Sequence, residues 1–311
     1  MDDRTFDTED LGARLSVAFP QLAPVRVAGL LGVGFNSIAV ETDNGIVFRI
    51  ARTEGTAQRF ARERRLLSVL RPLLPVSVPE PEWLIEASEE FPLGVSGYRK
   101  IEGQTLSPAL LRADNADKRA RDLGGVLATL HRMPVDSLPA ASRTPDEMLN
   151  TYRAVREETS PALRARLSRA EYERVDGWWQ AFLSDERLMN YQPAPVHNDF
   201  WYENFLVDAR AERLTAVLDW EFCDIGDPAV DFATLLHLGR DVTERVVAAY
   251  RSAGCVFEEP DRHRASRLWE LREFYGVLYS VRFADEDELS DALRKLRAGP
   301  LFDARKAFLI V

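Results

Sequence analysis

One polar loop sets the tightest limit on what this chain can fold into. The segment His197–Asn204 carries Asp199 and Asn204 with four residues between them, and Asp219 follows the apolar run Ala216–Leu218. An aspartate and an asparagine in a loop are most often capping groups when they stand alone. A second aspartate at the end of an apolar strand, in the right order downstream, is much harder to obtain by chance. The pattern therefore predicts a catalytic loop that precedes a strand ending in a functional carboxylate.

This order of polar groups matches the needs of phosphoryl transfer from a nucleotide to a hydroxyl. One aspartate accepts the proton of the attacking hydroxyl, while an asparagine and a second aspartate hold Mg²⁺ on the nucleotide phosphates. Magnesium requires oxygen ligands, and the base must be a separate carboxylate. We therefore predict Asp199 as the base and Asn204 and Asp219 as the magnesium ligands.

The first hundred residues predict a small antiparallel sheet followed by a helix. Apolar runs read as strands, and Asn44-Gly45 is a strong hairpin signal between two of them. Apolar residues at helical spacing predict one helix, which prolines then end. The expected strands are Val25–Leu31, Ile38–Glu41, Ile46–Ile50, Trp83–Ile85 and Tyr98–Ile101, and the expected helix is Thr56–Leu70.

Beyond residue 100 the pattern becomes mainly helical, with one strand-like interruption. Amphipathic periodicity predicts helices over Ala120–His131, Tyr172–Leu183, Ala229–Gly239 and Ala265–Val281. Two strand-like segments separated by a polar turn are predicted over Asn204–Val207 and Leu214–Trp220. The expected fold class is α+β, with a nucleotide-binding lobe over residues 1–100 and a catalytic and substrate-binding lobe over residues 101–311.

Charge and composition exclude several classes of protein. Forty Lys and Arg against fifty Asp and Glu give a net charge of −10, which disfavours a nucleic-acid partner and suits a cationic small molecule. Two cysteines imply no disulfide framework or metal cluster. The acidic first residues do not resemble a signal peptide, and no apolar run is long enough to span a bilayer. We expect a cytoplasmic monomer without a membrane or nucleic-acid partner.

The polar loop and its surroundings resemble the aminoglycoside phosphotransferases and their relatives, whose fold is similar to that of protein kinases. The resemblance lies in HNDFWYEN at His197–Asn204, LDW at Leu218–Trp220 and GDPAVDFA at Gly226–Ala233. It implies a bilobal fold, a small antiparallel sheet with one helix before a larger helical lobe, and a magnesium-dependent phosphotransferase. It also implies that His197 braces the catalytic loop and that Asp227 and Asp231 are structural. Asn198 stands where the family more often has a glycine or another small residue.

A kinase-like first lobe needs a glycine turn over the phosphates, a cation on the third strand and a carboxylate on the next helix. Gly32, Gly34 and Ser37 form the predicted turn, and Glu63 is the predicted helix carboxylate. Arg49 stands where protein kinases have lysine, but its guanidinium can still hold two phosphate oxygens. The run Phe48–Arg52 resembles macrolide phosphotransferases, which supports an active branch of the family.

The segment Ser96–Gly103 resembles the hinge between the lobes, and Thr105–Pro108 is most similar to aminoglycoside 2''-phosphotransferases. We expect Tyr98, Lys100 and Ile101 to lie at the nucleotide base. Backbone groups at such a hinge recognise the purine, so ATP and GTP both remain open as the co-substrate.

The resemblance implies an aminoglycoside as the acceptor, and the pocket of such a polycation should collect carboxylates near the base. The residues predicted to contact it are Trp201, Glu203, Glu270 and Glu273. A macrolide kinase and a kinase of choline, homoserine or a sugar remain alternatives. A nucleotide-binding pseudoenzyme and a metal-dependent hydrolase are alternatives from other classes. A protein substrate is disfavoured, since the chain reaches Gly226 soon after Asp219.

Overall fold

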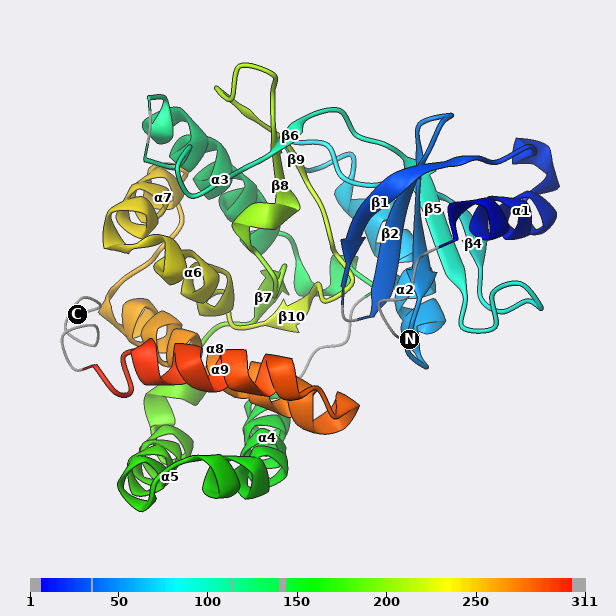
Figure 1. Cartoon of the computed structure of the whole chain (residues 1–311). Helices are drawn as coiled ribbons and strands as arrows, with labels where there is room; N and C mark the ends of the chain where they lie inside the picture. Colours follow the sequence, from blue (N-terminus) through cyan, green and yellow to red (C-terminus); the bar gives the residue numbers. More distant parts are fainter. Residues whose placement is uncertain (1–6, 35, 113, 140–143, 304–311) are drawn as a thin grey trace. The chain divides into compact units, whose positions relative to one another are not determined.

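The computed structural model describes residues 7–34, 36–112, 114–139 and 144–303, and it divides into two compact units (Figure 1). The first unit comprises Met1–Leu106, Asp136–Ala140 and Glu203–Cys223. The second comprises Ser107–Val135, Ala141–Tyr202 and Asp224–Val311. The division into functional lobes at residue 100 stays a prediction.

The first unit is built on a five-stranded antiparallel sheet with the order β1-β2-β3-β5-β4. The predicted hairpin at Asn44-Gly45 is confirmed, because Gly45 has a φ of 71° and its N–H donates to the Thr42 carbonyl. The strands are β1 Val27–Val33, β2 Ser37–Thr42, β3 Ile46–Ala51, β4 Pro81–Ile85 and β5 Val95–Arg99.

Two helices pack on this sheet, one of which the sequence did not predict. Helix α1, Thr8–Ala18, places Leu15 in an apolar cluster with Phe48 of β3. Successive side chains of a strand point to opposite faces, so Arg49 faces the other side. There its guanidinium lies over Phe60 of α2, Thr56–Leu70, whose bounds match the prediction. The alternation along β3 therefore sends an apolar ring towards α1 and a cation towards α2.

A smaller three-stranded sheet completes the first unit, with the order β6-β8-β9. Its strands are β6 Gln104–Thr105, β8 Phe205–Val207 and β9 Leu214–Val217, and β8 pairs antiparallel with both neighbours. Strand β9 is buried at Ala216 and Val217 and leads directly to Asp219. The predicted strand-like interruption is thereby confirmed as a hairpin, and it leads to the carboxylate that is predicted to be functional.

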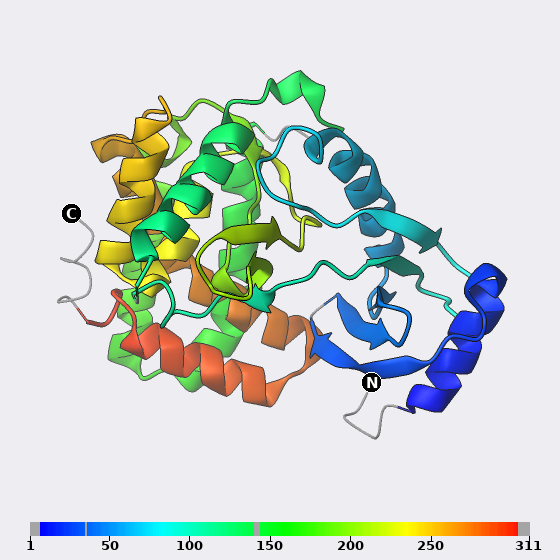
Figure 2. The same ribbon diagram turned by 90° about the horizontal axis from the view of Figure 1, so that it is seen from above.

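The second unit is mainly helical, and one strand pair frames its polar loop. Strands β7, Ala194–Val196, and β10, Asp224–Gly226, pair antiparallel. Figure 2 shows α9 lying along α8. The helices are α3 Ala116–His131, α4 Pro145–Arg166, α5 Arg169–Leu183, α6 Ala229–Leu235, α7 Arg240–Ser252, α8 Glu259–Phe283 and α9 Glu286–Ala298. Short 3₁₀ segments along the chain are Pro20–Leu22, Val135–Ser137, Glu186–Met189, Tyr202–Asn204 and Leu236–Leu238.

Helices α3 and α7 approach closely because α3 carries a glycine at the contact. A Cβ at Gly124 would lie 2.7 Å from the Ala249 side chain and 2.8 Å from the Tyr250 nitrogen. Any larger residue would separate the helices. The close approach brings His131 of α3 to Tyr250 of α7, whose ring centroids are 5.5 Å apart.

Three helices of the second unit were absent from the sequence-based expectation. Helix α4 is polar and contains Pro161, but it begins with a capping box between Thr144 and Glu147. The acidic run at Asp285–Glu288 forms the first turn of α9, where carboxylates stabilise the positive end of the helix dipole. That position accounts for the acidic run without a ligand. Helix α7 is the third helix that the sequence did not predict.

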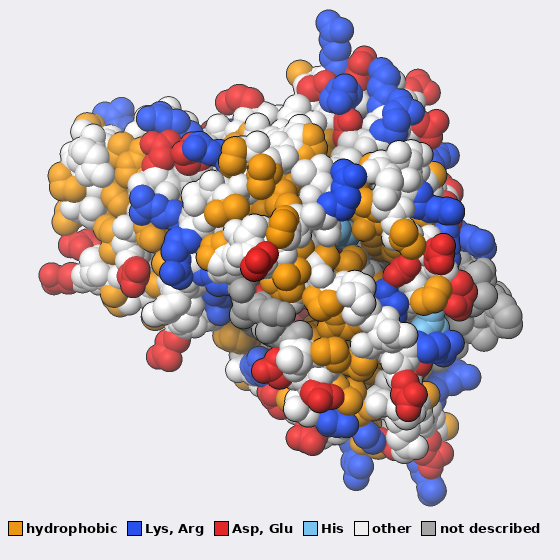
Figure 3. All heavy atoms as spheres, turned by 180° about the vertical axis from the view of Figure 1, so that it is seen from behind, with side chains coloured by type: hydrophobic (Ala, Val, Ile, Leu, Met, Phe, Trp, Pro, Cys, Tyr) orange, Lys and Arg blue, Asp and Glu red, His pale blue; other side chains and the backbone are white. Residues whose placement is uncertain are grey.

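The surface of the molecule carries charges of both signs. Figure 3 shows blue Lys and Arg side chains interspersed with red Asp and Glu side chains over the face in view. Across the described parts of the chain, no helix combines the length and the apolar character that crossing a membrane requires.

Candidate active site

The predicted site residues fall into both compact units. Asn204 and Asp219 belong to the first unit, together with Arg49 and Glu63, whereas His197–Trp201 belongs to the second.

Arg49 is the centre of the polar cluster in the first unit. Its Nη1 donates to both oxygens of Glu63, at 3.0 and 2.8 Å. Its Nη2 donates to Asp219 Oδ1 at 3.0 Å and to Glu221 Oε2 at 2.6 Å. The predicted pairing of the strand cation with the helix carboxylate is present, and the same guanidinium also reaches the predicted magnesium ligand.

Burial shapes the ionisation of this cluster. Burial alone would lower the pKa of Arg49, but Glu63, Asp219 and Glu221 together raise it above its ordinary value. Burial raises the pKa of Glu63 to about 7, against the opposing effect of Arg49. Burial and the Asp219 charge likewise raise the pKa of Glu221. Three carboxylates around one cation give this cluster an excess of acidic groups.

Glu221 is a member of this cluster that the sequence analysis missed. Its side chain is 4% exposed, and its second oxygen accepts from Asn36 Nδ2 at 2.6 Å. Asn36 lies between Gly34 and Ser37 in the predicted glycine turn. Glu221 therefore connects the turn to the strand cation. Its position two residues after Asp219 was the only available signal in the sequence.

Gly32, the first glycine of the predicted turn, has open space where a side chain would lie. A Cβ at Gly32 would meet no atom within 4 Å, and Gly32 does not have a positive φ. Neither packing nor backbone conformation in the described residues requires glycine there. A glycine inside a strand often marks the close approach of a ligand to the backbone. The Gly34 N–H donates to the Ser37 carbonyl and closes the turn at 2.9 Å.

Asn204 and Asp219 lie at the same end of the β8–β9 pair. Phe205 pairs with Val217, and the Leu218 N–H donates to the Asn204 carbonyl at 2.8 Å. Asp219 has a φ of 58°, which is uncommon for a residue with a side chain and typical of functional sites. Carboxylate and amide oxygens are the ligand types that Mg²⁺ prefers, so this donor pair fits magnesium. Within the described residues, no cluster of three or more His, Cys, Asp or Glu side chains forms a metal site.

The predicted hinge residues lie in and after β5. Tyr98 is half-buried close to Arg49, and burial raises its pKa to about 12. Lys100 Nζ is 2.8 Å from both oxygens of Glu41, at the surface of the unit. Ile101 follows, half-buried, before β6. The structure thus places Tyr98 beside the Arg49 cluster and pairs Lys100 with Glu41.

In the second unit, Asp231 holds the loop that carries Asp199. Asp231 is fully buried, and its two oxygens accept from the backbone N–H groups of His197 and Asn198, each at 2.8 Å. His131 Nε2 lies 3.1 Å from the same carboxylate, and His131 Nδ1 lies 3.1 Å from the Tyr250 hydroxyl. A buried chain of polar groups therefore fixes the start of the loop, as the structural role expected for Asp231 implies.

The loop backbone explains the residue at position 198. Asn198 has a φ of 66°, in the left-handed region that glycine and asparagine adopt most readily. His197 is fully buried, and its Nδ1 accepts the Asp199 N–H at 3.3 Å. Asp199 itself is half-buried. The loop is thus held on one side by Asp231 and on the other by His197, which leaves the predicted base at its partly exposed turn.

Asp227 performs a different structural task. Its Oδ1 accepts the Ala229 N–H at 3.0 Å at the start of α6, and its Oδ2 accepts from Arg264 Nε at 2.9 Å. Arg264 is buried, so the pair is a buried ion pair. Asp227 closes the start of the helix, as the structural role expected for it implies.

Trp201 lies at the centre of an aromatic cluster two residues after Asp199. The guanidinium of Arg272 lies 4.0 Å from the Trp201 ring centroid, and His237 packs edge-on at 5.4 Å. Trp269 contacts the other side of His237 at 5.6 Å. The Trp201 N–H donates to the Asp199 carbonyl at 2.8 Å. The cluster is therefore attached directly to the loop of the predicted base.

Comparison with known proteins identifies the family. The model of the "Phosphotransferase enzyme family" matches residues 30–268, which is more than half of the chain. The chain belongs to the phosphotransferase enzyme family. It is a phosphotransferase with a protein-kinase-like α+β fold.

Individual relatives of this phosphotransferase modify antibiotics. Viomycin phosphotransferase of Streptomyces vinaceus is 27% identical over 89% of this chain and 96% of its own. The complex of an APH(2") enzyme with GDP and kanamycin has a TM-score of 0.78 at 22% identity, covering 92% of this chain and 96% of that one. Macrolide 2'-phosphotransferase MphH of Brachybacterium faecium has a TM-score of 0.69 at 22% identity, covering 91% and 97%.

The residues predicted to contact the acceptor of the phosphotransferase lie in different environments. Glu203 is exposed, at the end of the catalytic loop. Glu270 is engaged inside the second unit, where it accepts from Trp178 Nε1 at 2.7 Å and from Arg267. Glu273 follows Arg272 on α8, and burial raises its pKa. Within this set, only Glu270 has both a ring N–H and a guanidinium as described partners.

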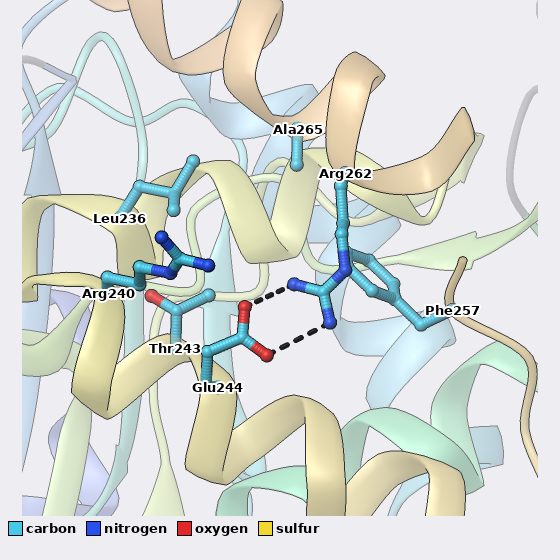
Figure 4. A pocket seen from close by; sticks show the side chains of 7 residues that line it. All are labelled: Leu236, Arg240, Thr243, Glu244, Phe257, Arg262 and Ala265. Atoms are coloured by element: carbon cyan, nitrogen blue, oxygen red, sulfur yellow. Dashed lines mark hydrogen bonds and ion pairs between the residues drawn. The ribbon is translucent and has the colours of Figure 1, made fainter. Parts of the chain in front are cut away.

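A small cavity elsewhere in the second unit is closed by an ion pair (Figure 4). Its volume is about 20 Å³, which is room for about one water molecule. Glu244 of α7 pairs there with Arg262, whose Nη2 donates at 2.9 Å. Phe257 lines the same cavity. This cavity is too small for an acceptor.

The aromatic cluster predicts a measurable pH dependence of stability. Burial, with Arg272 and Lys295 nearby, lowers the pKa of His237 from 6.5 to about 3. The unfolded chain therefore binds this proton below pH 6.5 while the folded chain does not, so stability is lost as the pH falls. Between pH 7.5 and 5.5 this contribution amounts to about 1.4 kcal/mol.

The measurement is urea denaturation of the wild type and of His237→Asn at both pH values. We expect the variant to lose less stability between pH 7.5 and 5.5 than the wild type. The control is His263→Asn, which removes a histidine that pairs with Asp185 and leaves the His237 contribution in place. Equal pH dependence in wild type and His237→Asn would contradict the assignment.

Proposed function

We propose that this enzyme transfers the γ-phosphoryl group of ATP or GTP to a hydroxyl of an antibiotic, with an aminoglycoside as the preferred acceptor. The observation that carries the proposal is the linkage of Arg49, Glu63 and Asp219 in one partly buried cluster, at 2.8 and 3.0 Å. This set comprises a strand cation, a helix carboxylate and a metal-binding carboxylate, which are the parts that a kinase-like nucleotide site requires.

The chemical step assigns a separate task to each of the proposed residues. The acceptor hydroxyl donates its proton to Asp199 as its oxygen attacks the γ-phosphorus. The new oxygen–phosphorus bond forms while the bond to the β-phosphate oxygen breaks, and the nucleoside diphosphate leaves. Asp231 and His197 keep Asp199 in position through the loop backbone. Mg²⁺, held by Asn204 and Asp219, would neutralise the charge on the phosphates.

The acceptor class is supported by the relatives and by charge. Viomycin phosphotransferase and the kanamycin complex both have names that point to antibiotics, and the net charge of −10 favours a cationic acceptor. Trp201, Glu203 and Glu273 are the residues we propose to contact it. For Glu270, the bonds to Trp178 and Arg267 favour a supporting role.

The test is release of nucleoside diphosphate from ATP and from GTP, in Mg²⁺, with separate acceptors. The acceptors are kanamycin, gentamicin, streptomycin, viomycin, a macrolide, choline and homoserine, and Asp199→Asn is the control. We expect turnover that depends on an aminoglycoside and is lost in the control.

Other outcomes would replace this function with a defined alternative. Turnover with the macrolide alone, or with a metabolite alone, would show that the acceptor belongs to that class and is not an aminoglycoside. Nucleotide hydrolysis unaffected by any acceptor would indicate a hydrolase. Nucleotide binding, seen as a rise in melting temperature, without any turnover would indicate a pseudoenzyme.

A further inference from the structure

The terminal nitrogens of Arg49 already donate to carboxylates. A guanidinium carries two hydrogens on each Nη atom and one on Nε. Nη1 donates to the carboxylate of Glu63, and Nη2 makes one bond to Asp219 and one to Glu221. Arg49 was expected to hold phosphate oxygens. With both bonds of Nη2 in place, this nitrogen has no N–H left for a phosphate, so one of its two carboxylates has to leave before Nη2 can bind one.

The three carboxylates are not held equally. Glu63 is 2% exposed, lies within hydrogen-bond distance of Nη1 with both of its oxygens and also accepts the Trp220 N–H at 3.1 Å. Glu221 is 4% exposed and is held by Asn36 as well. Asp219 is 36% exposed and makes the longest contact with Nη2. Asp219 is therefore the partner that Arg49 releases most easily.

We infer that Asp219 is shared between Arg49 and the divalent cation, so that metal binding releases one N–H of Arg49 for the nucleotide phosphates. Glu221 keeps the other Nη2 hydrogen and holds the guanidinium in position during the exchange. The inference rests on the proposed function, because Asp219 is the proposed magnesium ligand. It makes Glu221 a positioning residue and couples metal and nucleotide binding through Arg49.

The inference predicts an unusual effect for the loss of a metal ligand. Asp219→Asn keeps a residue that tolerates the positive φ at this position, but its neutral amide holds Arg49 less strongly. In EDTA, we expect the variant to bind the nucleoside diphosphate more tightly than the wild type, by about fivefold or more. Isothermal titration calorimetry with ADP and with GDP measures this without any turnover. Adding Mg²⁺ should tighten binding in the wild type and have little effect in Asp219→Asn.

A double-mutant cycle separates this exchange from simple charge repulsion. If Arg49 mediates the gain in nucleotide affinity, Asp219→Asn does not raise that affinity in an Arg49→Met background. A gain that persists in that background, or no gain in the single variant, overturns the inference. Because Arg49→Met leaves buried carboxylates without their cation, its melting temperature is measured first.

A direct probe keeps the test decisive if Arg49→Met does not fold. Side-chain nitrogen NMR of Arg49 follows its Nη groups while Mg²⁺ alone is added. We expect the Nη signals to shift in the wild type and to stay unchanged in Asp219→Asn. Unchanged signals in the wild type would overturn the exchange.

Glu221→Gln tests the positioning role. We expect it to weaken nucleotide binding in Mg²⁺ by about fivefold and to raise the nucleotide KM more than it lowers kcat. The matched control is Glu80→Gln, which removes one charge from an exposed pair with Arg71 in the same unit. If the two variants change nucleotide binding equally, Glu221 does not position Arg49.

The same measurements distinguish a failure of this inference from a failure of the proposed function. If the wild type binds no nucleotide, the proposed function fails as well. If the wild type binds nucleotide and the double-mutant cycle is additive, only the coupling through Arg49 fails.

Discussion

Asp199→Asn is expected to lower kcat by about 10²–10⁴-fold, which is the usual contribution of a general base. The asparagine keeps the size of the side chain but cannot accept the proton of the acceptor hydroxyl. The loop backbone is held by Asp231 and His197 through groups that this substitution leaves intact. The fold and nucleotide binding should therefore be nearly unchanged.

The measurement pairs steady-state kinetics with calorimetry of nucleotide binding. Asp176→Asn is the control, because it removes a carboxylate from a partly exposed pair with Arg156 in the same unit and should cost less than about 1 kcal/mol of stability. A loss of nucleotide affinity equal to the loss of kcat would contradict the role of Asp199 as a base. Full activity of Asp199→Asn would show that another residue acts as the base.

The parts of the site that local patterns specify were predictable from the sequence. The alternation along β3 and the helical periodicity of α2 together bring Arg49 to Glu63, since both residues face the space between strand and helix. The hairpin that ends at Asp219 follows from two apolar runs and a polar turn. In each case the information lies within about 20 neighbouring residues, which is the range in which periodicity and turn signals act.

The partners that were missed depend on contacts between distant segments. Glu221 accepts a hydrogen bond from Asn36, which lies 185 residues earlier in the chain. No local sequence pattern indicates a contact of that range. Arg272 lies over Trp201 from a helix whose own periodicity indicated core packing. Helices α1 and α4 were missed for a related reason: helical stability comes mostly from tertiary packing of one face, and composition alone does not reveal that face.

The unusual residue in the catalytic loop shows how backbone geometry limits sequence. Asn198 stands where the family more often has a glycine or another small residue, and the resemblance implies that this departure is mild. Its φ of 66° explains both choices, because glycine and asparagine adopt this region at the lowest cost. The departure therefore preserves the conformation that presents the next residue, Asp199.

Asp231→Ala is expected to lower the free energy of unfolding by about 3 kcal/mol and to lower kcat at least tenfold. The fully buried carboxylate accepts two backbone N–H groups of the loop and lies 3.1 Å from His131. Its removal leaves these donors buried without an acceptor, and each such group costs roughly 1–3 kcal/mol. The loop then loses the contact that fixes the orientation of Asp199.

Asp227→Ala is the control that separates loop positioning from stability. It removes the buried partner of Arg264 and the cap of α6 but no contact to the loop backbone, so it should destabilise the fold by a similar or larger amount. At a temperature where both variants are folded, we expect kcat to fall in Asp231→Ala and to be largely kept in Asp227→Ala. If kcat follows stability in both, Asp231 supports the fold alone. If kcat falls only in Asp231→Ala, then the two N–H groups of His197 and Asn198 are the route by which a residue buried in α6 controls the catalytic base.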